Sequence, residues 1–129
     1  MKSRQPETQL RDAIRDAVNA TGLAWVNVNA RGRRGRVPLG LMPSGSADLV
    51  GLLASGHFFA LEIKMPRGKR SAAQVEWAEK VRKCGGIVYV VTSIPEAMEA
   101  LKSATQVVTL RGEGFTIAAL HALPARTKL

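Results

Sequence analysis

Two apolar runs separated by three residues constrain the fold of this chain more than any other feature of its sequence. The runs are residues 47–53 and 57–63, and Ala54-Ser55-Gly56 joins them. Apolar runs joined by a short turn that contains glycine predict two adjacent antiparallel strands. Because both runs are apolar at nearly every position, we expect central strands that are covered on both faces.

The other elements follow from the spacing of apolar residues and from helix-start and helix-stop signals. Helical spacing predicts three helices, at residues 6–20, 71–83 and from Pro95 to about 103. The second helix should bury Val75, Ala78 and Val81. β-Branched or alternating stretches predict strands at 25–29 and 87–91 and a terminal hairpin from 107–110 and 115–117. Residues 30–46, rich in Arg, Gly, Pro and Ser, should form a loop.

This order of elements predicts an α/β fold with a mixed central β-sheet flanked by helices. The strand-helix-strand step between Phe58 and Val91 should be a right-handed parallel crossover. With 129 residues and no linker, the chain should form a single domain over residues 1–129.

The net charge restricts the partners that the protein can have. Lys and Arg number 19 against 10 acidic residues, a formal charge of +9, which favours a polyanionic partner but does not separate DNA from RNA. The single cysteine, Cys84, excludes an internal disulfide, and with His57 and His121 it cannot complete a structural zinc site. Since no signal peptide or membrane span is recognisable, we expect a soluble cytoplasmic protein with no membrane partner.

Three ionisable residues stand at one end of the predicted strand pair. Glu62 and Lys64 end the second run, and Asp48 opens the first. Burying a charge without a partner is costly, so charged residues at these positions require a cause. Alternation along the strand places Glu62 and Lys64 on the same face as Phe58 and Ala60.

The position of the turn decides which of these residues face each other. A hairpin centred on Ser55 places Asp48 opposite Glu62, and one centred on Gly56 places Asp48 opposite Lys64. Both put the three side chains on one face, whereas an even number of loop residues would not. In the first register the two Cβ atoms would lie roughly 5 Å apart, where the carboxylates repel. A divalent cation between them turns this repulsion into a binding site.

Asp48 followed by Glu62-Ile63-Lys64 resembles the PD-(D/E)XK nuclease pattern, in which an acid leads one strand and Glu-x-Lys lies on its neighbour. The chain is similar to the VRR-NUC branch, of stand-alone phage or bacterial type, whose pattern adds a helical Glu, Gly-x-Pro-Asp and a downstream Gln. Glu7, Gly45-Ser46-Ala47-Asp48 and Gln74 match these parts, except that Ala47 stands where the family usually has Pro.

The resemblance covers about residues 6–95 and implies a restriction-endonuclease-like core there, with residues 96–129 as a C-terminal extension. It also implies a hydrolase, a DNA endonuclease that depends on Mg²⁺ or Mn²⁺ and cleaves phosphodiester bonds. Stand-alone relatives suggest a homodimer acting on branched DNA such as four-way (Holliday) junctions, because a two-fold dimer offers two active sites to a pseudo-two-fold substrate.

The family pattern assigns a role to each matching residue. Asp48, Glu62 and the backbone carbonyl of Ile63 would be metal ligands, and Glu7 would reach the metal directly or through water. Lys64 would orient or activate the attacking water, and Gln74 would hold Lys64 or that water. Glu7 and Gln74 also have structural interpretations, because acids suit a first helical turn and Ser71-Ala72-Ala73-Gln74 fits a capping box.

Basic residues on both sides of the predicted strand pair are candidates for contacts with the nucleic-acid backbone. The set consists of Arg31, Arg33, Arg34, Arg36, Arg67, Lys69 and Arg70. No nucleotide cofactor is expected, because the glycine spacing of Gly40 and Gly45 lacks the Lys of a P-loop. The alternatives are a non-catalytic basic module that binds nucleic acid, a structural assembly protein with a basic surface, and a nuclease acting on flaps, nicks or RNA.

Overall fold

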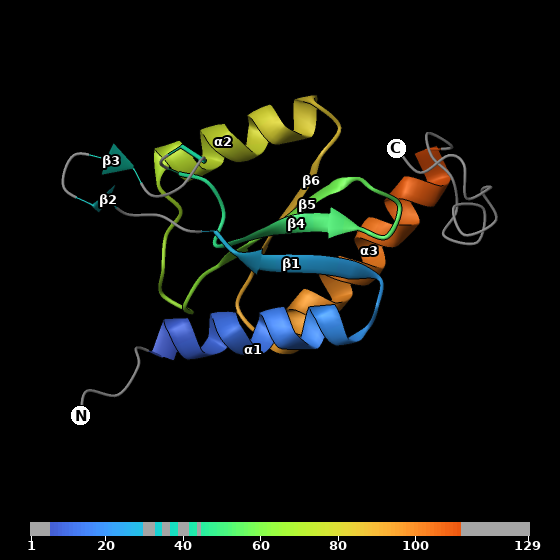
Figure 1. Ribbon diagram of the computed structural model, residues 1–129, viewed down its shortest axis with the longest axis horizontal. Coiled ribbons are helices and arrows are strands. Elements are labelled where there is room, and N and C mark those ends of the chain that lie inside the picture. The colour runs from blue at the N-terminus through green and yellow to red at the C-terminus, as the bar shows by residue number, and fades with distance from the viewer. Residues whose placement is uncertain (1–5, 30–32, 35–36, 39–41, 44, 112–129) are drawn as a thin grey trace.

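A four-stranded sheet with helices on both faces forms the centre of the molecule (Figure 1). The computed structural model describes residues 6–29, 33–34, 37–38, 42–43 and 45–111. The helices are α1 (Pro6–Ala20), α2 (Ala72–Lys83) and α3 (Ile94–Arg111). The strands are β1 (Ala24–Val28), β2 (Arg33–Arg34), β3 (Val37–Pro38), β4 (Leu49–Leu53), β5 (Phe58–Ile63) and β6 (Ile87–Val91).

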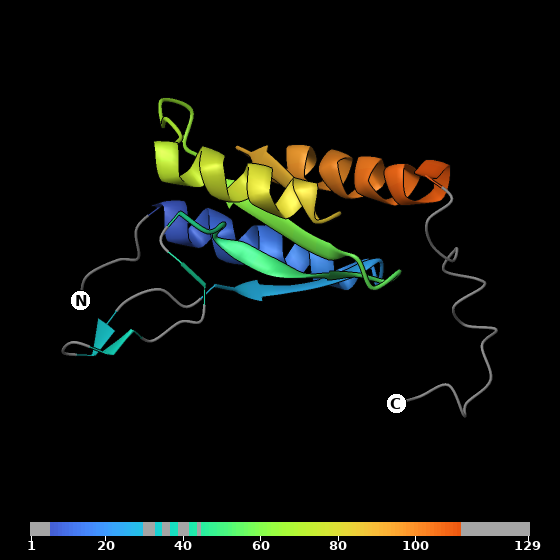
Figure 2. The same ribbon diagram turned by 90° about the horizontal axis from the view of Figure 1, so that it is seen from above.

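The sheet has the order β1-β4-β5-β6, with α1 and α3 on one face and α2 on the other; Figure 2 shows the same arrangement from above. β1, β4 and β5 are antiparallel, while β6 runs parallel to β5 because α2 carries the chain back across the sheet. The mixed sheet flanked by helices confirms the predicted fold class. β4 and β5 are its central strands, as predicted.

The β4–β5 hairpin selects one of the two registers that the sequence allows. Leu49 pairs with Leu61, and Leu52 pairs with Phe58. The Leu53 amide donates to the His57 carbonyl at 2.9 Å, so the turn consists of residues 54–56 and is centred on residue 55. Continued by one residue, this register places Asp48 opposite Glu62.

Strand β5 is buried on both of its faces, as its continuous apolar sequence predicts. Phe59, Leu61 and Ile63 are fully buried in the cluster beneath α1 and α3. Ala60 packs in the second cluster, beneath α2, where Phe58 is partly buried. The ionisable Glu62 therefore lies in the best-packed strand of the molecule.

Helix α2 begins at the predicted capping box. The Gln74 amide donates to Ser71 Oγ at 3.1 Å, and the Ser71 amide donates to Gln74 Oε1 at 2.9 Å. The predicted buried face is wrong in part, because Val75 is 37% exposed while Trp77 is buried beside Ala78. Trp77 packs edge-on against Phe58, with the ring centroids 6.1 Å apart, and this large contact sets the rotation of the helix.

Helix α3 runs well beyond its predicted end, so the predicted strand at 107–110 is wrong. Its buried residues continue at helical spacing and line the core facing α1 and the sheet: Ala97, Ala100, Leu101, Ala104 and Val108. Packing of this stripe outweighs the β propensity of Val107-Val108-Thr109. The core therefore extends past Pro95, where the family resemblance stops. The other predicted strand, at 115–117, lies outside the described residues.

The predicted loop at 30–46 contains a short antiparallel pair, in which Arg33 pairs with Pro38 and Arg34 with Val37. This pair forms a sheet of its own, separate from the central one. The prediction of an irregular loop is thus incomplete.

The outer edge of β1 is bound by a side chain from α1. Asn19 Nδ2 donates to the Val26 carbonyl at 2.8 Å, and the Val26 amide donates to Asn19 Oδ1 at 2.8 Å. The amide side chain thus replaces a neighbouring strand at this position. None of the helices in the described part of the chain is both long and apolar enough to cross a membrane.

The extended α3 leads to a test of the core. Val108→Asp should lower the free energy of unfolding by about 2–4 kcal/mol, because it buries a carboxylate. Gln106→Asp, on the exposed side of the same turn, should change it by less than about 0.5 kcal/mol. Urea denaturation followed by circular dichroism measures both. Equal effects of the two substitutions would place residue 108 outside the core.

Candidate active site

Asp48 is held at the point where β4 and β5 meet at the end of the sheet. Its Oδ2 atom accepts a hydrogen bond from the Ile63 amide at 2.8 Å, and its carbonyl accepts one from the Asn29 amide at 2.9 Å. The side chain thereby caps the last residue of β5. Asp48 is tied to the strand that carries Glu62, as the predicted strand pairing requires.

A buried polar contact positions the segment that leads into Asp48. Asn29 Nδ2 donates to Ser46 Oγ at 2.6 Å and to the Ala47 carbonyl at 3.0 Å. Ser46 and Ala47 are fully buried, and Asn29 is 8% exposed. Sequence reasoning missed Asn29, because one asparagine at the end of a strand carries no signal of a contact with residues 17 and 18 positions away.

Gly45 allows this segment to approach helix α2. It has a φ of 90°, which strongly favours glycine, and a Cβ there would lie 2.6 Å from the Ala73 carbonyl carbon. The segment therefore packs against the first turn of α2. Ala47, which replaces the usual proline of the family pattern, occupies a buried position where its side chain joins the cluster under α2.

Glu62 is fully buried, and its carboxylate is bound by Arg70. Arg70 Nε lies 2.9 Å from Oε2, and Nη2 lies 3.2 Å from Oε1, so the contact is bidentate. Arg70 is 27% exposed at its side chain. The positive guanidinium neutralises a charge that would otherwise be buried alone. Sequence reasoning placed Arg70 among the candidate phosphate contacts and did not foresee this pairing.

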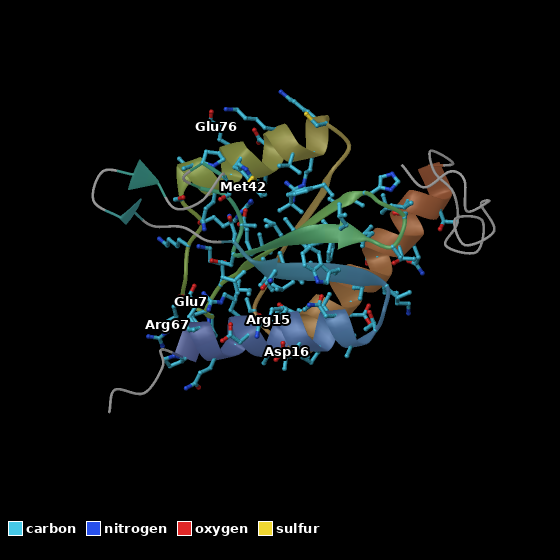
Figure 3. All side chains as sticks on the ribbon, viewed as in Figure 1. Glu7, Arg15, Asp16, Met42, Arg67 and Glu76 are labelled. Carbon is cyan, nitrogen blue, oxygen red and sulfur yellow. The ribbon has the colours of Figure 1, made fainter. Side chains whose placement is uncertain are left out.

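A cleft of about 610 Å³ opens beside Asp48. It is lined by Pro6, Glu7, Thr8, Arg11, Asp48 and Met65. Glu7 is exposed on the first turn of α1, and Figure 3 shows Glu7 and Arg67 at the same end of the molecule. The first turn of α1 and the start of the segment between β5 and α2 therefore border the same hollow.

Lys64 directly follows β5 and is half-buried. Its amide donates to the Val91 carbonyl at 2.9 Å, which extends the pairing with β6. Its ammonium group forms no ion pair with any residue that the structure describes. Gln74 uses its Oε1 atom in the cap of α2, and within the described ranges it makes no hydrogen bond to Lys64. The structure thus shows the capping role of Gln74, and its proposed site role stays a prediction.

The candidate phosphate-binding residues divide into two groups. Arg67 and Lys69 are exposed in the segment between β5 and α2, whereas Arg70 is engaged with Glu62. The side chains of the second group, Arg31, Arg33, Arg34 and Arg36, lie outside the described residues, as does His121. His57, directly after the β4–β5 turn, is half-buried, with Nδ1 2.8 Å from Ser55 Oγ.

The donor chemistry at the end of β4 and β5 suits a hard divalent cation. Asp48 directly precedes β4 and comes opposite Glu62 of β5 when the register is continued by one residue, and Glu62 already holds a positive group. Mg²⁺ is commonly bound by one or two carboxylates together with water and phosphate oxygens. Over the described ranges, no three acidic, histidine or cysteine side chains form a group suited to a metal. The protein's share of such a site would therefore rest on Asp48 and Glu62.

Comparison with known proteins supports the fold. A solved structure described as a "VRR_NUC domain" superimposes with a TM-score of 0.59 at 22% sequence identity. The match covers 77% of this chain and 97% of that one. No family model and no curated protein matches the sequence. The chain thus has the VRR_NUC fold, a restriction-endonuclease-like α/β arrangement, which confirms the resemblance at the level of the fold.

The contact of Asn29 with Ser46 and Ala47 predicts a large effect of a small substitution. Asn29→Ala should lower the free energy of unfolding by about 1–3 kcal/mol, since it leaves buried polar atoms without a partner. Asn27→Ala, at an exposed position two residues earlier, should change it by less than about 0.5 kcal/mol. Thermal and urea denaturation of both variants measure the difference. Similar free energies of unfolding for the two variants would show that the contact of Asn29 with Ser46 and Ala47 does not stabilise the fold.

Proposed function

We propose that this protein is a metal-dependent DNA endonuclease that hydrolyses phosphodiester bonds. The observation that carries the proposal is the strand register, which, continued by one residue, places Asp48 opposite Glu62 at one end of the sheet, with Lys64 two residues beyond Glu62. The VRR_NUC fold supports it, because the acid directly precedes β4 and the Glu-x-Lys motif spans the end of the adjacent β5, as in the family pattern.

Asp48 and Glu62 would hold the cation, Mg²⁺ or Mn²⁺, with the Ile63 carbonyl as a further oxygen donor. A bound metal would supply Lewis-acid polarisation of the phosphoryl oxygen and a bound water of lowered pKa. The hydrogen bond from the Ile63 amide to Asp48 orients one carboxylate for this task. Glu7, which lines the same cleft as Asp48, would reach the metal directly or through a water molecule.

Lys64 would orient the attacking water and offset the negative charge that builds on the phosphate. Its position favours this role, because it is half-buried and, among the described residues, its charge is not consumed by an ion pair. Gln74 would assist through its amide Nε2, since Oε1 belongs to the helix cap.

We further propose that the substrate is branched DNA, such as a four-way junction, and that the protein acts as a homodimer. The net charge of +9 favours a polyanion. Arg67 and Lys69 are exposed at the start of α2 for contacts to the DNA backbone, and the arginines of residues 31–36 would extend that surface. The preference for junctions and the two-fold assembly rest on the resemblance to stand-alone VRR-NUC proteins.

One observation favours a second candidate, a basic module that binds nucleic acid without cleaving it. The carboxylate of Glu62 is satisfied by Arg70, as it would be if the acids served only to balance basic residues. Such a module predicts intact affinity, no cleavage and no effect of Asp48→Ala.

A cleavage assay with labelled DNA distinguishes the endonuclease from the non-catalytic binding module. With Mg²⁺ or Mn²⁺, the parent should cut a four-way junction in preference to fork, duplex and single strand, and EDTA should stop it. Asp48→Ala and Lys64→Ala should each reduce the rate about 100-fold or more, because each removes a charge that acts in the transition state.

Asp16→Ala, at an exposed position of α1, and Lys102→Ala, at an exposed position of α3, are the matched controls and should cut like the parent. Circular dichroism verifies that all four variants are folded. Binding without any cutting by the parent would favour the non-catalytic module. Cutting that survives in both site variants would refute the assignment of the site.

A further inference from the structure

The contact between Glu62 and Arg70 has no counterpart elsewhere in the described part of the chain. Glu62 is the one charged residue there that is buried, with an exposed fraction of 0%. Arg70 contacts both of its oxygens, at 2.9 and 3.2 Å. A lone buried carboxylate would destabilise the fold by several kcal/mol, so the guanidinium acts here as the required counter-ion.

We propose that Arg70 is a built-in counter-ion, which occupies the carboxylate of Glu62 until a divalent cation displaces it. The inference rests on the proposed function and deepens it, because it names the residue that sets the affinity of the site for metal. In the folded protein without metal, Arg70 neutralises Glu62. In the metal-bound protein, the cation takes over this role.

The guanidinium of Arg70 and a divalent metal ion would compete for the carboxylate of Glu62. Both oxygens of Glu62 already accept hydrogen bonds from the fork of Arg70. A metal ion bound to either oxygen would lie only a few ångströms from the guanidinium, where like charges in a poorly solvated site repel strongly. A bound metal would therefore weaken or displace the contact with Arg70, and the free energy lost in doing so subtracts from the affinity for metal.

The side chain of Arg70 has the freedom that this exchange requires. It is partly exposed, at 27%, and Glu62 is its only ion-pair partner among the described residues. The backbone next to it is fixed, because the Ser71 amide is held by Gln74 in the capping box. The guanidinium can thus swing towards solvent while the main chain and α2 stay in place.

Replacing Arg70 with methionine, of similar reach and without charge, tests the exchange. Calorimetric titration of EDTA-treated protein with Mn²⁺ should give a dissociation constant at least about tenfold lower for Arg70→Met than for the parent. In EDTA, Arg70→Met should melt at a lower temperature than the parent, because Glu62 loses its counter-ion. Saturating Mn²⁺ should raise its melting temperature by more than it raises the parent's.

Arg67→Met and Lys69→Met are the matched controls, since each removes one nearby positive charge without touching Glu62. They measure the general electrostatic effect and should change the dissociation constant by less than about threefold. Arg70→Lys keeps the charge but loses the fork, so its affinity for Mn²⁺ should fall between those of the parent and Arg70→Met. If Arg70→Met does not fold without metal, the comparison of Arg70→Lys with the parent tests the proposal instead.

The possible results separate this inference from the proposed function. If the parent binds Mn²⁺ but neither Arg70 variant binds it more tightly than Arg67→Met does, the exchange is refuted and the metal site stands. If neither the parent nor any variant binds Mn²⁺, the metal site itself is refuted, and the exchange with it. A gain in affinity in all three methionine variants would also overturn the proposal, because it would assign the effect to net charge.

Discussion

The pairing of β4 with β5 in one register is the constraint on which the rest of the structure depends. With Leu49 opposite Leu61, the apolar side chains of both strands enter the two cores, and the register continued by one residue places Asp48 opposite Glu62. A slip of one residue would turn every side chain of one strand to the other face. The same pairing therefore builds the core and assembles the candidate site.

Electrostatics imposes a second condition on that site. A carboxylate buried deeply enough to bind a metal tightly is a liability in a chain that must fold before metal arrives. Here the bidentate contact with Arg70 supplies the balancing charge from a residue only eight positions further along. For the proposed metal site, folding and loading would thus be separable events, in contrast to small metal domains that are unfolded without their ion.

Local patterns in the sequence predicted most of the fold. The bounds of α1 and the capping box of α2 follow from residues close together in the chain, and the structure confirms them. For the β4–β5 hairpin the sequence allowed two registers, and the structure has the one centred on residue 55. The length of α3 and the exposure of Val75 were missed because they depend on packing partners distant in sequence. For the candidate site, the roles of Asp48, Glu62 and Lys64 stay predictions, and the contacts of Arg70 with Glu62 and of Asn29 with Ser46 and Ala47 were not foreseen, because they join residues whose sequence positions carry no sign of a pairing.

The contact of Asn19 with Val26 has a consequence for association between molecules. A strand at the border of a sheet offers its free peptide groups to any passing strand, which is a route to aggregation. By engaging the amide and carbonyl of Val26, Asn19 removes the attachment point in the middle of β1. Addition of another strand at this edge is therefore disfavoured at its centre, because the peptide groups of Val26 are already bound.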